Sequence, residues 1–543
     1  MKIKIFVILL LLVFSALVLS AALRTSGTCD EIAHHIPVGY VLLTKWDFKM
    51  DTSQPPLARY IIAVPLKLFM HINMPEDKNK WRIEDRSIFG RDFFYKYNTD
   101  SKKILFLCRI PVMIIGALCG LLLFVWVASL YGERAGLLSL FLYCFSPSIL
   151  AHSGLATTDI IATFFIFLSV YSFWLFLNKS SFTRSFFTAA CLGLAQLAKY
   201  NAILLYPIFL VLMVFESQKT GKSKITGILT KFIIAVVLSL VVVWAGYGFD
   251  FQPILKDAMR VNDKVEMARK IMPFLSDAKL HDILFRIPIP LGSHILGISG
   301  VFRHSYEGHR TFFLGKWSGE GNIFYFLVAF MIKNPIPMLI LFIIGFFIVI
   351  KKGVGRAERV VLITLAAYFI ASSLGKLQIG IRHILPLYPL CFMIAGRTAE
   401  LLNRKFLNLA VAILIAWHIF LTLIAWPNYI GYFNEIIGGS RNGYKYLRDS
   451  NIDWGQDLPA LSDYMKKNNI NEVVLEYFGQ SDPAVYGIRY KKLQPEELVK
   501  PKDKTYAISA QNLESARWAR DYKQTAIVGS SIFIYDLTKK NYK

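Results

Sequence analysis

The stretch ILFLCRIPVMIIGALCGLLLFVWVASLY, residues 104–131, decides the fold class of this chain. An α-helix needs roughly 20 apolar residues to cross the hydrocarbon core of a bilayer, and this stretch is longer than that. The whole chain of 543 residues is 55% hydrophobic and has a mean hydropathy of +0.45. Because a soluble core does not need so many apolar residues, we expect a mainly α, polytopic integral membrane protein.

Comparable stretches recur through the first four fifths of the chain. We predict about 11 transmembrane helices from their lengths, at residues 3–22, 104–131, 135–151, 157–177, 185–199, 201–215, 228–248, 335–351, 358–374, 382–399 and 406–426. The first stretch also fits a secretory signal peptide, because it has a basic start and ends in Ser20-Ala21-Ala22.

Lys and Arg in alternate loops predict the orientation, since positive loops stay in the cytoplasm. Lys2 and Lys4 place the N-terminus inside. The same alternation assigns to the cytoplasm the basic loops around Arg134, Lys179 with Arg184, Lys219 to Lys224, Lys351 to Arg359, and Arg404 with Lys405. Residues 23–103, residues 249–320 and everything after about residue 427 are then expected on the outer face.

A soluble C-terminal domain is predicted after the transmembrane domain of residues 1–430. Residues 431–543 are mixed and charged, which predicts a small extracytoplasmic α/β domain. Strands are expected at 473–478, 506–509 and 527–535, and helices at 459–468 and 513–520. Five of the six cysteines lie in predicted spans and Cys29 does not, so no disulfide framework is expected.

The charge balance is strongly basic, with 61 Lys and Arg against 37 Asp and Glu and a net charge of +24. Loop orientation explains part of this excess. It does not explain the basic residues on the predicted outer side, which would suit a phosphate-bearing ligand: Arg303, Arg310, Lys376 and Arg382. Nucleic acid is not an expected partner for a chain with this much membrane.

Acidic residues stand at two places on the predicted outer face. Asp30 and Glu31 follow the first span, and Asp159 follows Thr157-Thr158 at the edge of another. An ordinary helix start would also favour acids such as Asp30 and Glu31. Acids at the edge of a span are costly and usually functional, however, so we expect the two places to share one cavity.

Two basic positions at the outer ends of spans are candidates for binding a phosphate. Lys199 precedes Tyr200, and Arg382 precedes His383. A lysine that only extends its charge toward the interface, or an interfacial anchor, explains each of them separately. Several cations together favour a phosphate site.

The C-terminal domain opens with the dense polar run DSNIDWGQDL, residues 449–458. Asp449 and Asp453 in this run could bind a sugar, and a metal site is a weaker alternative because no His or Cys pair stands nearby at ligand spacing. The same residues could instead cap the helix that follows.

Taken in order, these motifs resemble the GT-C superfamily of polyprenyl-phosphate-sugar glycosyltransferases. The resemblance is to bacterial relatives of the protein O-mannosyltransferases and of the aminoarabinose lipid A transferases. It rests on Asp30-Glu31, on Gln54-Pro55-Pro56-Leu57, on the segments 152–159 and 193–199, and in the tail on Tyr432-Phe433-Asn434-Glu435, Gly438-Gly439 and residues 449–458. Gln54 stands where the family often has His, which puts in doubt a role for that residue in ordering the acceptor.

The resemblance implies an inverting sugar transfer at the outer face of the bacterial inner (plasma) membrane. Asp30 is the expected base, and Glu31 and Asp159 would orient it or the acceptor. Lys199 and Arg382 would stabilise the leaving phosphate. The expected substrate-binding residues are His34, Gln54, Pro55, Pro56, Lys199, Tyr200, Arg303, Arg310, Arg382, His383, Asp449 and Asp453. The expected partners are a polyprenyl-phosphate-linked sugar, membrane lipids and an acceptor of unspecified class, with no metal and no cofactor.

Two other functions fit parts of this pattern. A flippase for lipid-linked sugars would also need many spans and a basic cavity, but related halves and acids near the bilayer midplane are expected of it. A structural subunit that presents the C-terminal domain leaves the outer acids and cations unexplained.

Overall fold

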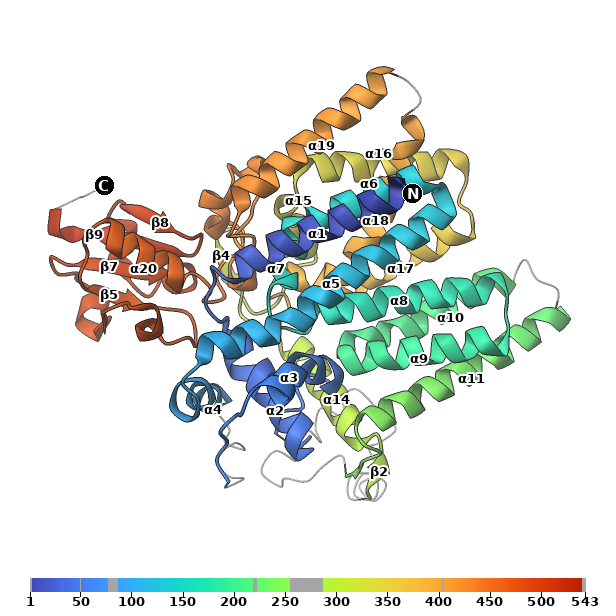
Figure 1. The fold of residues 1–543 in the computed structure, drawn as a ribbon, viewed down its shortest axis with the longest axis horizontal. Helices are drawn as coiled ribbons and strands as arrows, with labels where there is room; N and C mark the ends of the chain where they lie inside the picture. The colour runs from blue at the N-terminus through green and yellow to red at the C-terminus, as the bar shows by residue number, and fades with distance from the viewer. Residues whose placement is uncertain are drawn as a thin grey trace.

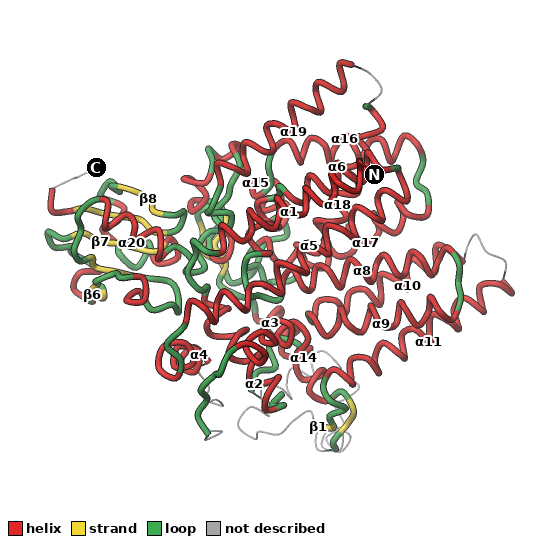
Figure 2. The backbone as a smooth tube through the Cα atoms, in the orientation of Figure 1, coloured by secondary structure: helices red, strands yellow, loops and turns green. Residues whose placement is uncertain are grey.

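The computed structural model describes residues 2–48, 50–76, 86–217, 222–253, 287–402 and 405–539. A bundle of helices makes up most of the molecule, and a small sheet lies at one end of it, beside the end of α1 (Figure 1). Helix dominates the bundle, and strands are confined to that sheet and to short hairpins (Figure 2). The predicted mainly α fold with a C-terminal region containing strands is confirmed.

Six of the described helices are each long and apolar enough to cross a membrane. They are α1 (Lys2–Ala22), α5 (Ser101–Tyr131), α8 (Asp159–Asn178), α11 (Lys222–Gly246), α17 (Arg356–Leu374) and α19 (Lys405–Ala425). Two bent helix pairs raise the number of spans to up to eight. The predicted count of about 11 spans is therefore not confirmed, although a multi-pass membrane protein is.

Proline explains the two bends, because its missing N–H suits the first turn of a helix and cannot continue the preceding one. The predicted span 135–151 is broken into α6 (Glu133–Cys144) and α7 (Pro147–Ser153), which meet at 63°. The predicted span 335–351 corresponds to α16 (Ile336–Lys352), which is bent by 115° from α15 (Tyr325–Lys333).

Three other predicted spans form shorter helices. Residues 185–199 lie in α9 (Phe182–Ala198), and residues 201–215 in the 3₁₀ turn η4 (Tyr200–Leu204) followed by α10 (Leu205–Ser217). The predicted span 382–399 is divided into η7 (Ile381–Leu387), α18 (Tyr388–Gly396) and η8 (Arg397–Leu401), with Pro386 and Pro389 at the first break. Arg382 is consequently in a tight turn and not at the start of a regular helix.

The two long loops predicted on the outer face carry their own structure. The first contains η1 (Glu31–His35), α2 (Ile36–Lys45), α3 (Pro56–Phe69), α4 (Arg86–Asp92) and η3 (Phe93–Tyr97). The second, with the residues that follow it, contains β1 (Phe251–Gln252), β2 (Ile289–Pro290), α14 (Gly292–Glu307), β3 (Thr311–Phe313) and β4 (Lys316–Ser318).

The C-terminal sheet has five strands in the order β6-β5-β7-β9-β8. Its elements are α20 (Leu458–Lys467), β5 (Val473–Glu476), β6 (Tyr490–Lys492), β7 (Thr505–Ser509), β8 (Ala526–Val528) and β9 (Ile532–Asp536). β5 pairs in parallel with β6 and β7, and β9 pairs antiparallel with β7 and β8. The predicted strand 527–535 is two strands, because Gly529 has a φ of 61° and turns the chain between them. The predicted helix 513–520 reduces to the 3₁₀ turn η15 (Arg517–Arg520).

Candidate active site

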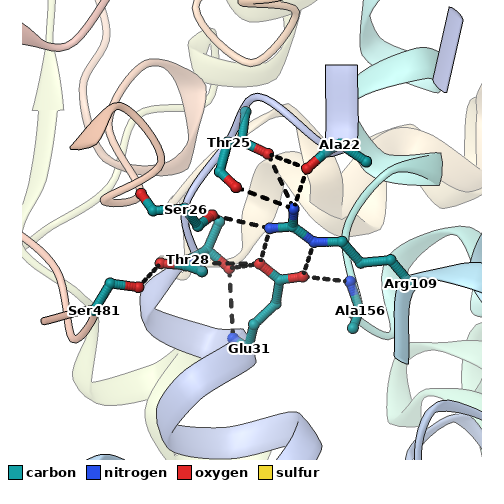
Figure 3. A network of polar contacts seen from close by, with 9 residues as sticks. Ala22, Thr25, Ser26, Thr28, Glu31, Arg109, Ala156 and Ser481 are labelled. Carbon is teal, nitrogen blue, oxygen red and sulfur yellow. Dashed lines mark hydrogen bonds and ion pairs between the residues drawn. The ribbon is translucent and has the colours of Figure 1, made fainter. Parts of the chain in front are cut away.

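A buried ion pair between Glu31 and Arg109 holds the chain where α1 ends and η1 begins (Figure 3). Both Glu31 carboxylate oxygens accept from the Arg109 guanidinium, each at 2.8 Å. The backbone N–H of Ala156 donates to one of these oxygens at 2.7 Å, and the backbone N–H of Thr28 donates to the other at 2.9 Å. Figure 3 shows Arg109 also reaching back to the end of α1, where it donates to the Ala22 carbonyl oxygen at 2.7 Å.

Glu31 therefore has a structural role in the loop. It is fully buried, and five hydrogen bonds from Arg109, Thr28 and Ala156 engage its two oxygens. Burial raises the pKa of Glu31, but Arg109 and these hydrogen bonds outweigh burial and hold the pKa below its usual value. A carboxylate with all its lone pairs engaged is poorly placed to accept a proton from a substrate.

Asp30 points to a different partner than Glu31, because neighbouring residues on a helical turn project in different directions. Arg382 in η7 donates to an Asp30 carboxylate oxygen at 2.7 Å. The Asp30 side chain remains 24% exposed, in contrast to that of Glu31. Burial raises the pKa of Asp30, while Arg382 and the two neighbouring histidines lower it, with a net shift downward. Asp30 is therefore an ionised carboxylate that solvent can reach.

Asp159 forms a second acid–cation pair. It is the first residue of α8, and Lys199, directly after α9, donates to its carboxylate at 2.6 Å. The Thr157 hydroxyl donates to the other carboxylate oxygen at 3.1 Å. His152 Nδ1 lies 3.7 Å from that same oxygen, which is too far for a hydrogen bond.

Trp454 connects the two acid–cation pairs. The Arg382 guanidinium carbon lies 4.3 Å from the centroid of the Trp454 ring, and the same ring meets the His152 ring edge-on at 6.0 Å. Burial lowers the pKa of Arg382, but Asp30, Asp159 and Asp449 together raise it. The structure thus brings together Asp30, Asp159, Lys199 and Arg382, which are far apart in the sequence.

The Gln54-Pro55-Pro56 motif lies beside this cluster. Arg59, fully buried in α3, donates to the Asp51 carboxylate at 2.5 Å and to the Gln54 carbonyl oxygen at 3.2 Å. Gln54, Pro56, Asp51, Tyr200 and Tyr247 contribute to the lining of a small pocket. The carboxylates of Asp30 and Asp51 both influence the pKa of His34, so His34 lies near each of them.

Burial keeps both histidines of η1 neutral near pH 7. It lowers the pKa of His34, and it lowers the pKa of His35 to about 3. Near pH 7 both imidazoles are therefore uncharged, and they lower the pKa of Asp30 only at acidic pH, where they bind protons.

Two expected site residues lie apart from the cluster. Arg303 pairs loosely with Glu307 on α14 at 3.8 Å, and Arg310 stacks over Trp317 at 4.7 Å. These contacts give no direct link to Asp30 or Asp159. His383 instead lies close to the cluster: it follows Arg382 in η7, its ring is 6.4 Å from that of Phe326, and Lys199, Arg382 and Asp159 all influence its pKa.

The acids of the run 449–458 differ in their surroundings. Asp453 is fully buried and accepts from the backbone N–H groups of Gly455 and Gln511, each at 3.2 Å, and burial raises its pKa to about 7. Asp453 therefore stabilises the C-terminal region itself. Asp449 lies near Arg382, since it contributes to the raised pKa of that guanidinium, and burial raises the pKa of Asp449.

Sequence reasoning missed Arg109 and Trp454. Arg109 stood inside the predicted span 104–131, where a charge is costly and needs a partner, so a signal for it was present. Trp454 lay inside the quoted polar run, but nothing in the sequence pairs it with Arg382. Within the ranges that the structure describes, no group of three or more His, Cys, Asp or Glu residues is arranged to hold a metal ion.

Residues 102–244 match the family model described as dolichyl-phosphate-mannose-protein mannosyltransferase. The predicted resemblance to that family is thereby confirmed for this part of the chain. The matched segment contains Asp159 and Lys199, whereas Asp30 and Arg382 lie outside it. A search of curated proteins finds no match.

Solved structures that match the chain include two of ArnT from Cupriavidus metallidurans. The apo form gives a TM-score of 0.48 at 11% identity over 98% of both chains. The form bound to undecaprenyl phosphate gives 0.47 at 11% identity, over 98% of this chain and 97% of that one. The oligosaccharyltransferase of Archaeoglobus fulgidus, tethered with an acceptor peptide, gives 0.44 at 12% identity, over 96% of this chain and 72% of that one.

The Glu31→Gln substitution is expected to lower stability. It leaves the buried Arg109 guanidinium without its counter-charge, and breaking such a pair typically costs about 3–5 kcal/mol. Thermal unfolding in detergent should give a clearly lower Tm for this variant, while Asp30→Asn, at a more exposed pair, should stay close to wild type. A wild-type Tm for Glu31→Gln would contradict the structural role assigned to this residue.

Proposed function

We propose that this protein is an inverting glycosyltransferase that moves a sugar from a polyprenyl-phosphate donor to an acceptor hydroxyl. The observation that carries the proposal is the meeting of one accessible carboxylate, Asp30, with two cations, Arg382 and Lys199, within a single connected cluster. A carboxylate can take a proton from a hydroxyl, and cations can stabilise a departing phosphate. The match of residues 102–244 to a family of dolichyl-phosphate-mannose transferases supports a donor of this chemical class.

The proposed reaction is a single displacement. Asp30 accepts the proton of the acceptor hydroxyl as the hydroxyl oxygen forms a bond to the anomeric carbon of the sugar. The bond from that carbon to the phosphate oxygen breaks on the opposite side, and its electron pair leaves with the polyprenyl phosphate. Attack from the side opposite the leaving group inverts the anomeric configuration.

Arg382 has two tasks in this proposal. Without a donor it pairs with Asp30. A bound phosphate would compete for the guanidinium, whose planar set of donors suits phosphate oxygens as well as a carboxylate. Drawing Arg382 toward the phosphate would remove the main partner that lowers the pKa of Asp30, and Asp30 would become a stronger base when the donor is in place.

The other two acids are assigned supporting roles. Glu31 fixes the loop that presents Asp30, through its bonds to Arg109. Asp159 holds Lys199 at the cluster through the 2.6 Å contact. Both are positioning residues in this proposal, and Asp30 alone handles the substrate proton.

The predicted orientation places this cluster outside the cytoplasm of a bacterial cell. The basic loops predicted in the cytoplasm include the end of α16 at Lys351 and Lys352 and the start of α17 at Arg356. The Asp30 loop follows the first span, one crossing away from the predicted cytoplasmic N-terminus. A lipid-linked donor would then lie with its tail between spans and its phosphate at the membrane surface.

The Asp30→Asn variant is expected to lose sugar transfer, because an amide cannot accept the hydroxyl proton. The test is transfer of radiolabelled sugar from a panel of synthetic polyprenyl-phosphate sugars by the purified full chain. Asp463→Asn, at an exposed position of α20, serves as the matched control and should keep wild-type turnover. Full activity in Asp30→Asn would remove the proposed base. Movement of a donor across liposomes without any turnover would identify a flippase instead.

The Lys199→Ala variant is expected to require more donor. Loss of a hydrogen bond to a charged group costs roughly 1.5–3 kcal/mol, which corresponds to a rise in donor KM of about 10- to 100-fold. Lys199→Arg keeps the charge beside Asp159 and should recover part of the loss. An unchanged donor KM in a folded Lys199→Ala protein would contradict the phosphate role.

The pH profile of Arg382→Gln is expected to shift on its acid side. Arg382 is the largest of the influences that depress the pKa of Asp30, while burial acts in the opposite direction and His34 and His35 contribute less. Without Arg382, the Asp30 carboxylate becomes protonated at a higher pH than in wild type. As the medium is acidified, the residual activity of Arg382→Gln should therefore begin to fall at a higher pH than wild-type activity does. Measuring kcat/KM against pH checks this, because that ratio reports the free enzyme, in which Arg382 still pairs with Asp30. An unmoved acid limb of kcat/KM would show that Arg382 does not control Asp30.

A further inference from the structure

The segment of residues 449–458, here called the C-terminal strap, lies against the loop that carries Asp30. The backbone N–H of Cys29 donates to the Trp454 carbonyl oxygen at 3.0 Å, and that of Ser26 donates to the Gln456 carbonyl oxygen at 2.9 Å. The Ser26 hydroxyl donates to the Gly455 carbonyl oxygen at 2.8 Å. The residue immediately before Asp30 is therefore tied to the strap through the main chain.

The strap also holds the turn that carries Arg382. The backbone N–H of Ile381 donates to the Asn451 side-chain oxygen at 3.0 Å, and the Ser450 hydroxyl donates to the Ile379 carbonyl oxygen. Between these contacts Gly380 has a φ of 140°, and a Cβ there would collide with the Ser450 side chain. The close approach therefore depends on a glycine directly before the turn.

A buried lysine fixes the strap to the helical bundle. Lys333, at the end of α15, is almost completely buried, and its ammonium group donates to the Asn451 carbonyl oxygen at 2.6 Å and to the Ile430 carbonyl oxygen at 2.7 Å. The Asn451 side chain donates in turn to the Tyr325 hydroxyl at 2.9 Å. Asn451 thus connects the strap, α15 and the backbone next to Arg382.

Trp454 covers one face of the Arg382 guanidinium. The residue is 2% exposed, and its ring centroid is 4.3 Å from the guanidinium carbon. The N–H groups of a guanidinium lie in its plane, so a ring that covers the face leaves those N–H groups free to bind acceptors. One of them donates to Asp30 at 2.7 Å.

We propose that the C-terminal strap is part of the active site and that Trp454 is the positioning residue that aims Arg382 at Asp30 and at the donor phosphate. This inference rests on the proposed function, because it gives Arg382 the phosphate of that reaction. The C-terminal region is then a fixed component of the site: the strap joins the Asp30 loop, the Arg382 turn and α15 through buried hydrogen bonds. A lid that opens in each turnover would have to break all of these contacts.

The test compares Trp454→Leu and Trp454→Phe in the purified full chain. Undecaprenyl phosphate binding, donor KM and kcat are measured, with Tm as a check on folding. Trp454→Leu should weaken undecaprenyl phosphate binding and raise donor KM by about 10-fold, the size expected of a desolvated cation–π contact. Trp454→Phe keeps an aromatic face and should recover most of the loss.

Trp426→Leu is the matched control. Trp426 also stacks on an arginine, Arg24, at 5.2 Å, but it follows α19 and contacts none of the cluster residues named above. This variant should keep wild-type binding and KM. Equal losses in Trp454→Phe and Trp454→Leu, or wild-type behaviour in Trp454→Leu, would overturn the positioning role. If Trp454→Leu does not fold, Trp454→Phe decides alone, since a loss of about 10-fold in it contradicts the proposal.

The two proposals fail in distinguishable ways. If wild-type protein transfers no sugar from any donor, the glycosyltransferase proposal fails. The undecaprenyl phosphate measurement then still decides whether Trp454 positions Arg382 for a phosphate. If wild type transfers sugar and Trp454→Leu is unaffected in binding and KM, only the positioning role fails.

Discussion

The buried pair of Glu31 and Arg109 is the contact on which the arrangement of the site depends. An unpaired arginine inside a span is costly, and Glu31 neutralises it while also accepting backbone bonds from Thr28 and Ala156. The pair therefore joins the end of α1, the first loop, α5 and the loop that leads to Asp159 (Figure 3). The Glu31 side chain is buried against Arg109, whereas the adjacent Asp30 faces Arg382 and solvent.

The surroundings of the acids near the site consequently separate those with a structural role from the one proposed to act on the substrate. The carboxylate oxygens of Glu31 and Asp453 accept hydrogen bonds from buried protein donors, and Asp159 binds the Lys199 ammonium group. Asp30 has one arginine partner and retains an exposed edge. This difference in burial and hydrogen bonding gives the proposed reaction its single base. It also makes Arg382 the residue through which binding of a phosphate would change the basicity of Asp30.

The sequence was sufficient to predict the membrane class and the C-terminal region with strands. It also singled out Asp30, Asp159, Lys199 and Arg382 as separate site candidates. It could not show how they pair, since 352 residues separate Asp30 from Arg382. Glu31 was expected to orient Asp30 or the acceptor, and only the fold reveals that Arg109 is its partner. Pro147 and Pro335 carried a signal for the two bends, because proline cannot continue a preceding helix. The apolar content alone suggested straight spans. The Arg382–Trp454 stack depends on how the C-terminal region docks, which no local pattern encodes.

An electron cryomicroscopy structure of the full chain with undecaprenyl phosphate bound would test directly whether a phosphate draws Arg382 away from Asp30. We expect the phosphate to contact Arg382, to lie within reach of Lys199, and to leave Asp30 separated from Arg382 with its carboxylate facing the space where an acceptor would enter. A phosphate bound elsewhere, with the Asp30–Arg382 pair intact, would contradict this expectation.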